Sequence, residues 1–388
     1  MRRFFVPGRL EVFGKHTDYA GGHTLVAAVP RGFTVHVTGT ADGVVRVTDT
    51  VSGEQQGYPS EGHAQAHVGW RRYPASVVKR LAANFPGTPL SARIDISSDL
   101  PRASGISSSS AFVVSIAEAL VSRARIDETD AWRRAVLNTE DRASYYACIE
   151  NGATFRELAG DAGVGTHGGS EDHAAILGSR AGHLTQYRFS PLRREQDVAM
   201  PAGWTFVIAT TGVRARKAGA AREAYNRAAA SAAAVHAAWR ARHPGDPRSL
   251  GDLVHEEALR SMELSAVLRA RLEHFLAEDA RVVLAAGAFA RADAAMLGDL
   301  AADSQRDADV LLANQVPETR ALVDLARDNG AHAASGFGAG WGGSVWALVS
   351  GGGAEGFLDA WLASYRAAHP HLPSTGFLAP PADGLRAL

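Results

Sequence analysis

Hydrophobic and polar residues follow two different periods along this chain, and each period predicts a kind of element. Period-two alternation of β-branched and apolar residues predicts strands, whereas apolar residues at helical spacing predict helices. The predicted strands are Phe4–Phe13 (interrupted by Pro7 and Gly8), Thr34–Thr40, Val44–Thr48, Ser91–Ser97, Thr205–Thr210 and Val345–Val349. The predicted helices are Pro74–Ala83, Ala111–Arg123, Asp130–Ala147, Glu171–Leu177, Ala220–Arg240 and Leu253–Ala301, the last with breaks near Ala277 and Gly287.

Strands and helices mix along the chain without a regular strand–helix alternation, which predicts an α+β fold rather than a doubly wound sheet. We expect Thr34–Thr40 and Val44–Thr48 to pair with each other around the turn at Ala41–Gly43. A chain of 388 residues is long enough for two cores. The charged, proline-bearing segment Gln186–Pro201 is where we expect the boundary, which gives domains of residues 1–190 and 191–388.

Composition narrows the class of partner. The chain has 40 basic and 41 acidic side chains with no basic stripe, which argues against nucleic acid and acidic membrane surfaces as partners. The single cysteine, Cys148, cannot form an internal disulfide, as expected in the reducing cytoplasm. No apolar run follows the Arg pair near the N-terminus, so we predict neither a signal peptide nor a membrane span. We expect a cytoplasmic monomer that acts on small molecules.

Candidate chemistry gathers in three glycine-rich stretches, and the second has the clearest physical meaning. Leu100–Ala111 (LPRASGISSSSA) leads directly into an apolar helix. Free backbone N–H groups and the positive end of the helix dipole meet there, which favours a phosphate. Serine hydroxyls at that position can also reach Mg²⁺ or phosphate oxygens. The alternative is an ordinary serine-capped helix after a loop, because the lysine of a P-loop is missing.

The first stretch, Pro7–Gly22 (PGRLEVFGKHTDYAGG), sets Arg9, His16 and Asp18 among glycines. A carboxylate and an imidazole suit neighbouring sugar hydroxyls, and a guanidinium can stabilise phosphate charge. The alternative for this stretch is a solvated, charged turn. The third stretch, Gly336–Ser344 (GFGAGWGGS), allows its backbone to approach whatever the other two bind.

An acidic segment completes the candidate site. Glu171 and Asp172 follow a glycine-laced loop that contains Gly168 and Gly169. Phosphoryl transfer to an alcohol often uses a carboxylate to orient the hydroxyl or accept its proton. These acids could instead only stabilise a helix N-terminus. Together the stretches predict an enzyme that moves a phosphoryl group from a nucleotide to a small polyol.

These motifs resemble those of a known family. PGRLEVFGKHTDYAGG resembles the galactokinase signature GRxNxIGEHTDYxxG, LPRASGISSSSA resembles that family's LPxGxGLSSSA loop, and GFGAGWGGSVWALV resembles its closing GxGFGG segment. Between these three motifs the chain shows weaker similarity to galactokinases, in the same order and along nearly its whole length. The wider group is the galacto-, homoserine, mevalonate and phosphomevalonate (GHMP) kinases.

The resemblance implies ATP- and Mg²⁺-dependent phosphorylation, in galactokinases at the anomeric hydroxyl of galactose. It also implies a fold: an N-terminal domain like the second domain of ribosomal protein S5, which contains a left-handed βαβ crossover, and a ferredoxin-like C-terminal domain. A left-handed crossover is the opposite of what general rules for parallel strands predict.

Residue by residue, the resemblance assigns these roles. Arg9 and Asp172 match the catalytic pair. His16, Asp18 and Tyr225 match positions that contact the sugar, and Lys15 and Gly169 are assigned to the same site. The triphosphate loop is matched by Ser104, Gly105, Ile106, Ser107, Ser108, Ser109 and Ser110. Ser109 is the expected Mg²⁺ ligand, with Glu157 as a second one.

The chain departs from the family pattern at four positions. Ala103 replaces a loop glycine, Glu11 replaces an asparagine, and His173 replaces a glutamine. Lys15 stands where galactokinases have a glutamate that contacts the outer end of the sugar. A cation there would favour an acidic sugar such as galacturonate. If Lys15 instead turns away or pairs with a carboxylate, galactose still fits.

A function of another class is also open: a non-catalytic protein that binds ATP and sugar and contacts a regulator. Relatives of that kind lack two residues after the serine run, whereas Ser110 and Ala111 stand there in this chain. Arg9 and Asp172 are present as well, which favours the kinase.

Overall fold

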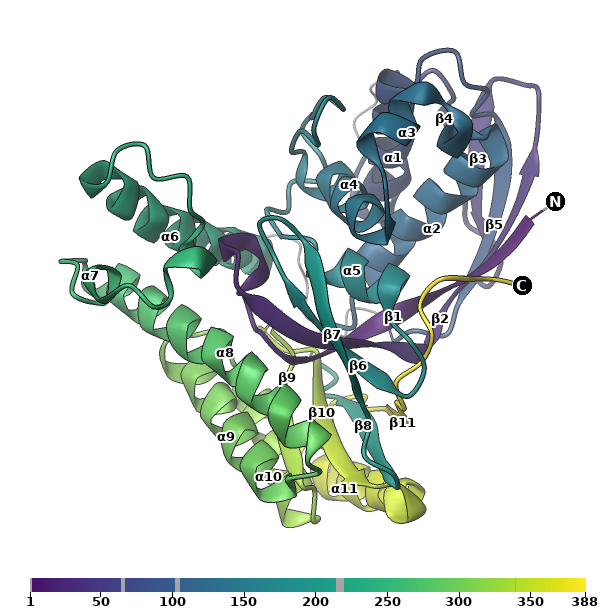
Figure 1. Cartoon of the computed structure of the whole chain (residues 1–388). Helices are drawn as coiled ribbons and strands as arrows, with labels where there is room; N and C mark the ends of the chain where they lie inside the picture. The colour runs from purple at the N-terminus through teal and green to yellow at the C-terminus, as the bar shows by residue number, and fades with distance from the viewer. Residues whose placement is uncertain (1, 64–66, 102–104, 214–219, 339) are drawn as a thin grey trace.

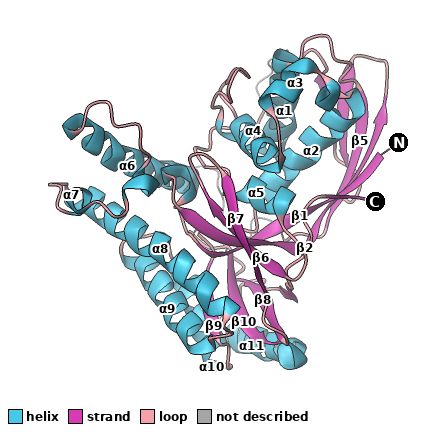
Figure 2. Cartoon of the chain, in the orientation of Figure 1, coloured by secondary structure: helices cyan, strands magenta, loops and turns pink. Residues whose placement is uncertain are grey.

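The computed structural model describes residues 2–63, 67–101, 105–213, 220–338 and 340–388. Two β-sheets form its framework, and helices pack against both (Figure 1). The mixture of helices and strands in Figure 2 agrees with the α+β class predicted from the sequence. In the described part of the chain, no helix is both long and apolar enough to cross a lipid bilayer.

The first sheet has eight strands in the order β12-β1-β2-β5-β3-β4, with β6 pairing β2 and β7 pairing β6. Its strands are β1 Arg2–Phe13, β2 His23–Gly39, β3 Val44–Asp49, β4 Gln55–Pro59, β5 Ala92–Ser98, β6 His183–Arg188, β7 Arg193–Ala199 and β12 Arg386–Ala387. The second sheet has the order β11-β8-β10-β9. It consists of β8 Trp204–Thr210, β9 Ala333–Gly336, β10 Ser344–Ser350 and β11 Gly376–Leu378.

Strand pairing corrects one expectation. Thr34–Thr40 and Val44–Thr48 do not pair with each other, because β5 lies between β2 and β3. β3 runs parallel to β5 and pairs on its other side with β4. Alternation predicted that both segments are strands, but it carries no information on which strand is the neighbour.

The helices are α1 Arg72–Asn84, α2 Ser108–Ala124, α3 Asp130–Ala135, α4 Thr139–Asn151, α5 Glu171–Gly178, α6 Ala220–Arg242, α7 Glu257–Arg260, α8 Ala266–Ala290, α9 Ala294–Val310, α10 Pro317–Asp328 and α11 Ala354–Ala368. Short 3-10 helices are η1 Asp18–Ala20, η2 Gly69–Arg71, η3 Ile126–Glu128, η4 Leu250–Leu253 and η5 Gly351–Gly353.

Two predicted helices divide differently from the expectation. Asp130–Ala147 is two helices, because Asn138 caps a new one by accepting the N–H of Asp141. In Leu253–Ala301, α8 runs without a break through Ala277 and Gly287. The breaks lie elsewhere: α7 ends at Arg260 before α8 begins, and a second break follows Ala290, where the side chain of Asp293 accepts the N–H of Met296 and starts α9.

Aromatic packing joins the two sheets at the point where the first glycine-rich stretch begins. The ring of Phe13, at the end of β1, lies 6.0 Å from that of Trp346 on β10. Trp346 also contacts Phe206 on β8, at 5.7 Å between ring centroids. All three rings are buried. The turn after β1 is therefore held against the second sheet and the helices that cover it.

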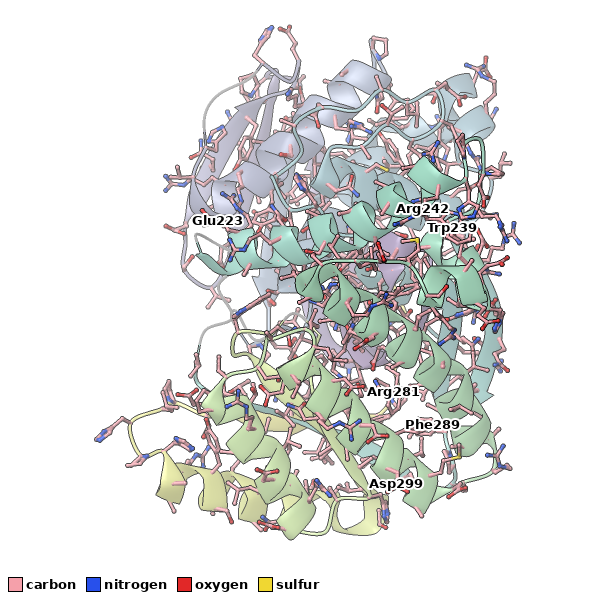
Figure 3. All side chains as sticks on the ribbon, turned by 90° about the vertical axis from the view of Figure 1, so that its left-hand side faces the viewer. Glu223, Trp239, Arg242, Arg281, Phe289 and Asp299 are labelled. Carbon is pink, nitrogen blue, oxygen red and sulfur yellow. The ribbon has the colours of Figure 1, made fainter. Side chains whose placement is uncertain are left out.

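One long helix reaches back to this region. Figure 3 shows α6, with Glu223 near one end and Trp239 and Arg242 near the other, crossing close to α8, which carries Arg281 and Phe289. Trp239 anchors the far end of α6: it is buried and donates its indole N–H to Asp246. The opposite end of α6 lies toward the first glycine-rich turn and carries Tyr225.

Candidate active site

A polar pocket lies where the three glycine-rich stretches meet. Side chains from β1, the turn after it, α2, the end of α4, the start of α5 and α6 line this pocket, together with the backbone at Gly338. The lining residues are Arg9, Glu11, His16, Asp18, Ser110, Glu150, Asn151, Thr166, Gly168, Gly169, Glu171, Asp172, His173, Tyr225 and Gly338.

Arg9 is the positive centre of the pocket. It is buried on β1, and its Nε donates to Oδ1 of Asp172 at 2.7 Å while Nη2 donates to Oε2 of Glu11 at 3.0 Å. Burial lowers the pKa of Arg9, but the charges of Asp172, Glu171 and Glu11 outweigh burial and raise it above its ordinary value. Nη1 is buried and has no hydrogen-bond partner among the residues that the structure describes, so it is a candidate donor to a bound group.

Asp172, in the first turn of α5, is held through both of its oxygens. Oδ1 accepts from Arg9, and Oδ2 accepts the hydroxyl of Ser110 at 2.9 Å. Ser110 also lies 2.9 Å from Oε2 of Glu150, near the end of α4. The Arg9–Asp172 contact therefore joins β1 to α5, and Ser110 ties the same carboxylate to the start of α2.

The turn after β1 points His16 and Asp18 into the pocket. Its shape requires left-handed backbone at Gly14, with φ of 108°, and at His16, with φ of 59°. The imidazole of His16 donates from Nε2 to the carbonyl oxygen of Gly338 at 2.8 Å, which leaves Nδ1 to accept the Tyr19 hydroxyl at 2.8 Å. This is a direct contact between the first and third glycine-rich stretches.

Asp18 is a buried carboxylate with backbone donors. Its Oδ1 accepts the N–H of Tyr19 at 2.8 Å, and Oδ2 accepts that of Glu171 at 3.3 Å. Burial raises the pKa of Asp18 to about 6, although these two N–H groups oppose the shift. A Cβ on Gly169 would collide with Oδ2 of Asp18, so only glycine allows this approach.

Tyr225 closes the pocket from α6. Its ring lies 5.0 Å from that of His16, and a Cβ on Gly168 would lie 3.0 Å from its hydroxyl. Arg9, His16, Asp18, Gly169, Asp172 and Tyr225 were all assigned to the site from the sequence, and the fold brings all six to one pocket.

Lys15 lies elsewhere. Its side chain is buried behind the turn, where Nζ donates to the hydroxyls of Ser304 at 2.6 Å and Ser335 at 3.0 Å. Oε1 of Glu278, on α8, lies 4.0 Å from Nζ. Lys15 does not line the pocket, so the geometry matches the alternative in which it pairs with a carboxylate.

The second glycine-rich stretch approaches β1 closely and then starts α2. The carbonyl of Ile106 accepts the N–H of Arg9 at 3.3 Å, and a Cβ on Gly8 would lie 2.9 Å from that carbonyl oxygen. Gly105 and Ser107 have positive φ, of 78° and 55°, and α2 begins at Ser108. The side chain of Ser107 does not cap the helix, so the first N–H groups of α2 remain available to an anion. Ser104 lies outside the described residues.

Half-buried aromatic rings surround the beginning of α2. Phe112 lies within 5.7 Å, 6.1 Å and 6.4 Å of Phe33, Trp70 and Tyr73, measured between ring centroids. These rings come from β2, η2 and α1. They offer an apolar surface for a flat ring beside a phosphate site.

The two expected metal ligands differ in where they lie. Ser109 is half-buried in the first turn of α2, next to Ser110. Glu157 does not line the pocket; 46% of its side chain is exposed, and its nearest charged partner is Arg134 at 3.8 Å. Glu150, which the sequence reading overlooked, lines the pocket instead. The sequence contained a signal for Glu150: a carboxylate in the last turn of a helix interacts unfavourably with the helix dipole, which suggests a role other than stabilising that helix.

A hydroxyl and a carboxylate near a triphosphate site suit Mg²⁺, which prefers oxygen ligands. Among the described side chains, no group of three or more His, Cys, Asp or Glu residues could hold a metal ion. At phosphoryl-transfer sites Mg²⁺ is commonly bound mainly by substrate phosphates and waters, with few ligands from the protein. Ser109 and Glu150 therefore fit a Mg²⁺ that arrives with the nucleotide.

Three segments of the chain match models of known protein families. Residues 2–38 match the galactokinase galactose-binding signature, residues 72–152 the GHMP kinases N terminal domain, and residues 285–367 the GHMP kinases C terminal domain. The galactokinase of Roseiflexus sp. (strain RS-1) is 28% identical over 354 residues, which is 90% of this chain and 84% of that protein. The galactokinase of Chloroflexus aggregans is also 28% identical, over 92% of this chain and 86% of its own length.

The fold is similar as well. The crystal structure of Lactococcus lactis galactokinase complexed with galactose matches with a TM-score of 0.80 and 22% identity, over all of this chain and 95% of that one. The segment of residues 2–38 contains Arg9 and the turn after β1, and the segment of residues 72–152 contains the serine-rich loop. The alignments with the two galactokinases cover 90% and 92% of this chain. The chain thus carries the galactokinase galactose-binding signature together with both GHMP kinase domains, and it is a phosphotransferase with an alcohol group as acceptor.

Proposed function

We propose that this protein transfers the γ-phosphoryl group of ATP to the anomeric hydroxyl of galactose or a closely related sugar. The observation that carries this proposal is the 2.7 Å contact between Nε of Arg9 and Oδ1 of Asp172, beside the open N-terminus of α2. A carboxylate and a guanidinium at a phosphate-binding helix end are the groups that in-line transfer to an alcohol requires.

Asp172 is the group that orients the sugar hydroxyl and accepts its proton. Each carboxylate oxygen has two lone pairs, and the contacts with Arg9 and Ser110 use one on each oxygen. A carboxylate oxygen can accept more than one hydrogen bond, so Asp172 can also accept one from the acceptor hydroxyl. The two fixed contacts keep the carboxylate from rotating, so the hydroxyl is aligned before the reaction begins.

Arg9 stabilises negative charge on both sides of the transfer. Its Nε lowers the cost of charge on Asp172. Its buried Nη1, which has no hydrogen-bond partner among the described residues, is a donor for an oxygen of the transferring phosphoryl group. Such a donor is already in place before the reaction, so no reorganisation is needed when charge develops.

The nucleotide is assigned to the start of α2. Gly105 to Ser110 supply backbone N–H groups and hydroxyls for the triphosphate, and the rings around Phe112 supply a surface for the base. Ser109 and Glu150 would hold Mg²⁺, which neutralises phosphate charge when it is bound. Gly168 and Gly169 leave room beside Asp18 and Tyr225 for sugar hydroxyls.

Galactose is favoured over galacturonate on the evidence of Lys15. An acidic sugar was expected only if the Lys15 ammonium faced the substrate, and this group is instead buried against Ser304, Ser335 and Glu278. A non-catalytic protein that binds ATP and sugar is also less favoured, because Arg9 and Asp172 lie in contact as a kinase requires.

ADP release with a panel of sugars tests the proposed function. We expect release with galactose or a close relative, and ³¹P NMR of the product should show the phosphate on the anomeric carbon. Absence of sugar-dependent ADP release with every sugar would leave a binding protein as the better explanation.

A further inference from the structure

The pocket carries far more negative than positive charge. Five carboxylates line it, and the Arg9 guanidinium is the one Lys or Arg side chain among its described lining residues. The carboxylates are those of Glu11, Asp18, Glu150, Glu171 and Asp172. Lys15, which could have offset this charge, lies outside the pocket with Glu278.

Two of these carboxylates are not explained by the proposed phosphoryl transfer. Glu11 and Glu171 are 2% and 4% exposed, and Oε1 of each is buried without a hydrogen-bond partner among the described residues. Arg9 reaches Oε2 of Glu11, and its Nε lies 3.2 Å from Oε1 of Glu171. Buried carboxylate oxygens are costly without a donor, so these two mark a place where a donor from outside is expected.

The negative groups lie close enough to repel one another. Burial and the charge of Glu11 raise the pKa of Glu171 well above its ordinary value, and the charges of Asp18 and Asp172 add to this effect. A second cation beside Glu11 and Glu171 would relieve this repulsion and pair with Oε1 of Glu11, and with Oε1 of Glu171 next to Arg9. The electrostatic potential of the pocket therefore favours a positively charged ligand.

The cation is better explained as an organic ammonium than as a metal ion. Among the described residues, no group of three or more carboxylates, histidines or cysteines is arranged to hold a metal. The metal-ligand candidate Glu150 is tied to Ser110 rather than to Glu11 or Glu171. An ammonium group has three N–H donors and no acceptor, which suits several separate carboxylate oxygens.

We propose that the preferred acceptor is an amino sugar, a galactose-like ring bearing a free amine whose ammonium is bound by Glu11 and Glu171. This inference rests on the proposed sugar-kinase function and names its substrate class. The ammonium pairs with Oε1 of Glu11 and with Oε1 of Glu171, which it shares with the Arg9 guanidinium, while His16, Asp18 and Tyr225 bind hydroxyls of the ring.

The first test compares acceptors with wild-type protein. kcat/KM for ADP release is measured with galactose, galactosamine, 6-amino-6-deoxygalactose, N-acetylgalactosamine and galacturonate. We expect one of the two free amines to exceed galactose by about tenfold or more, and N-acetylation to remove the advantage because it removes the charge. Galacturonate should be the poorest, because its carboxylate would meet like charges.

Variants then locate the preference. Glu11→Gln and Glu171→Gln keep size and polarity but remove one charge each, and each should lower the ratio of amino sugar to galactose by about tenfold. Glu273→Gln, on the exposed face of α8, is the matched control and should leave the ratio unchanged. Thermal unfolding of each variant separates a lost preference from lost folding, and the wild-type comparison does not depend on any variant.

The outcomes separate this inference from the function on which it rests. Phosphorylation of galactose at a rate equal to or above both free amines overturns the inference and leaves the sugar kinase intact. An amino-sugar preference that survives both Glu→Gln changes also overturns it, because the ammonium then binds elsewhere. Absence of turnover with every sugar overturns both the proposed function and the inference.

Discussion

Nζ of Lys15 lies 4.0 Å from Oε1 of Glu278, and neither side chain is more than 1% exposed. The same Oε1 accepts the backbone N–H of Gly14 at 3.0 Å. Glu278 thus holds the turn that carries His16 and Asp18 against α8. The positive charge that replaces the family's glutamate stabilises the turn from behind and does not contact the substrate pocket.

Lys15→Met should therefore act on stability. It leaves the Glu278 carboxylate with less compensation inside the protein, and breaking a buried pair typically costs about 3–5 kcal/mol. Urea unfolding should show a loss of that order. Lys79→Met is the control: Lys79 is 42% exposed and pairs with Asp161 at the surface, so the loss should be under about 1 kcal/mol. Equal losses in both variants would contradict a structural role for Lys15.

Asp18→Asn should separate stability from activity. Burial raises the pKa of Asp18 to about 6, above that of an exposed carboxyl, so the folded state binds this proton more tightly than the unfolded state. The contribution of Asp18 to the free energy of unfolding is therefore greatest at low pH, and it is lost as pH rises through about 6. Without this charge, the variant should be more stable at pH 7, by on the order of 2 kcal/mol.

Urea unfolding of wild type and Asp18→Asn at pH 4, 5, 6 and 7 measures this difference. The gap between them should open as pH rises, while kcat/KM for the sugar falls in the variant because an acceptor for its hydroxyls is lost. A variant that is less stable than wild type at pH 7 would show that the ionised carboxylate contributes more through its two backbone contacts than it loses by burial.

Gly169→Ala should damage the sugar site without a change in charge. The added methyl group would collide with Oδ2 of Asp18 and shift that carboxylate. We expect KM for the sugar to rise about tenfold or more, with KM for ATP little changed. Gly352→Ala, where an added Cβ meets nothing within 4 Å, is the matched control. Unchanged sugar KM in the Gly169 variant would remove Asp18 from sugar binding.

Glu150→Gln should raise the Mg²⁺ concentration needed for half-maximal rate, because a neutral amide is a weaker ligand for a hard cation. Glu157→Gln should not, since that side chain is largely exposed and outside the pocket. Titrating free Mg²⁺ at constant MgATP measures both. A higher Mg²⁺ requirement in Glu157→Gln but not in Glu150→Gln would identify Glu157 as the ligand, as the resemblance to the family implies.

The sequence predicted the fold class and most of the pocket for identifiable reasons. Arg9, His16, Asp18 and Asp172 stand in short motifs whose glycines fix the local backbone, so their convergence could be expected before the fold was known. Local periodicity could not place β5 between β2 and β3, because strand neighbours are decided by contacts distant in sequence.

The orientation of the Lys15 side chain could not be predicted either, because it too depends on contacts distant in sequence. The direction of its side chain is set by contacts with Glu278, Ser304 and Ser335. These residues lie hundreds of positions later in the sequence, on α8, α9 and β9. A motif shows which residue stands at a position but not which distant groups will attract it. Glu150 was overlooked for the opposite reason: it lies in an ordinary helix, and its contacts with Ser110 and His173, which are distant in sequence, connect it to the pocket.

The most direct test of the phosphotransferase mechanism is the turnover of wild-type protein and Asp172→Asn with ATP, Mg²⁺ and the best sugar of the panel, followed by ³¹P NMR. We predict a sugar phosphate with wild type and a loss of about 10²–10⁴ in kcat with the variant, with ATP binding retained. Near-normal turnover in Asp172→Asn would contradict the mechanism, because the carboxylate paired with Arg9 would then have no part in the transfer.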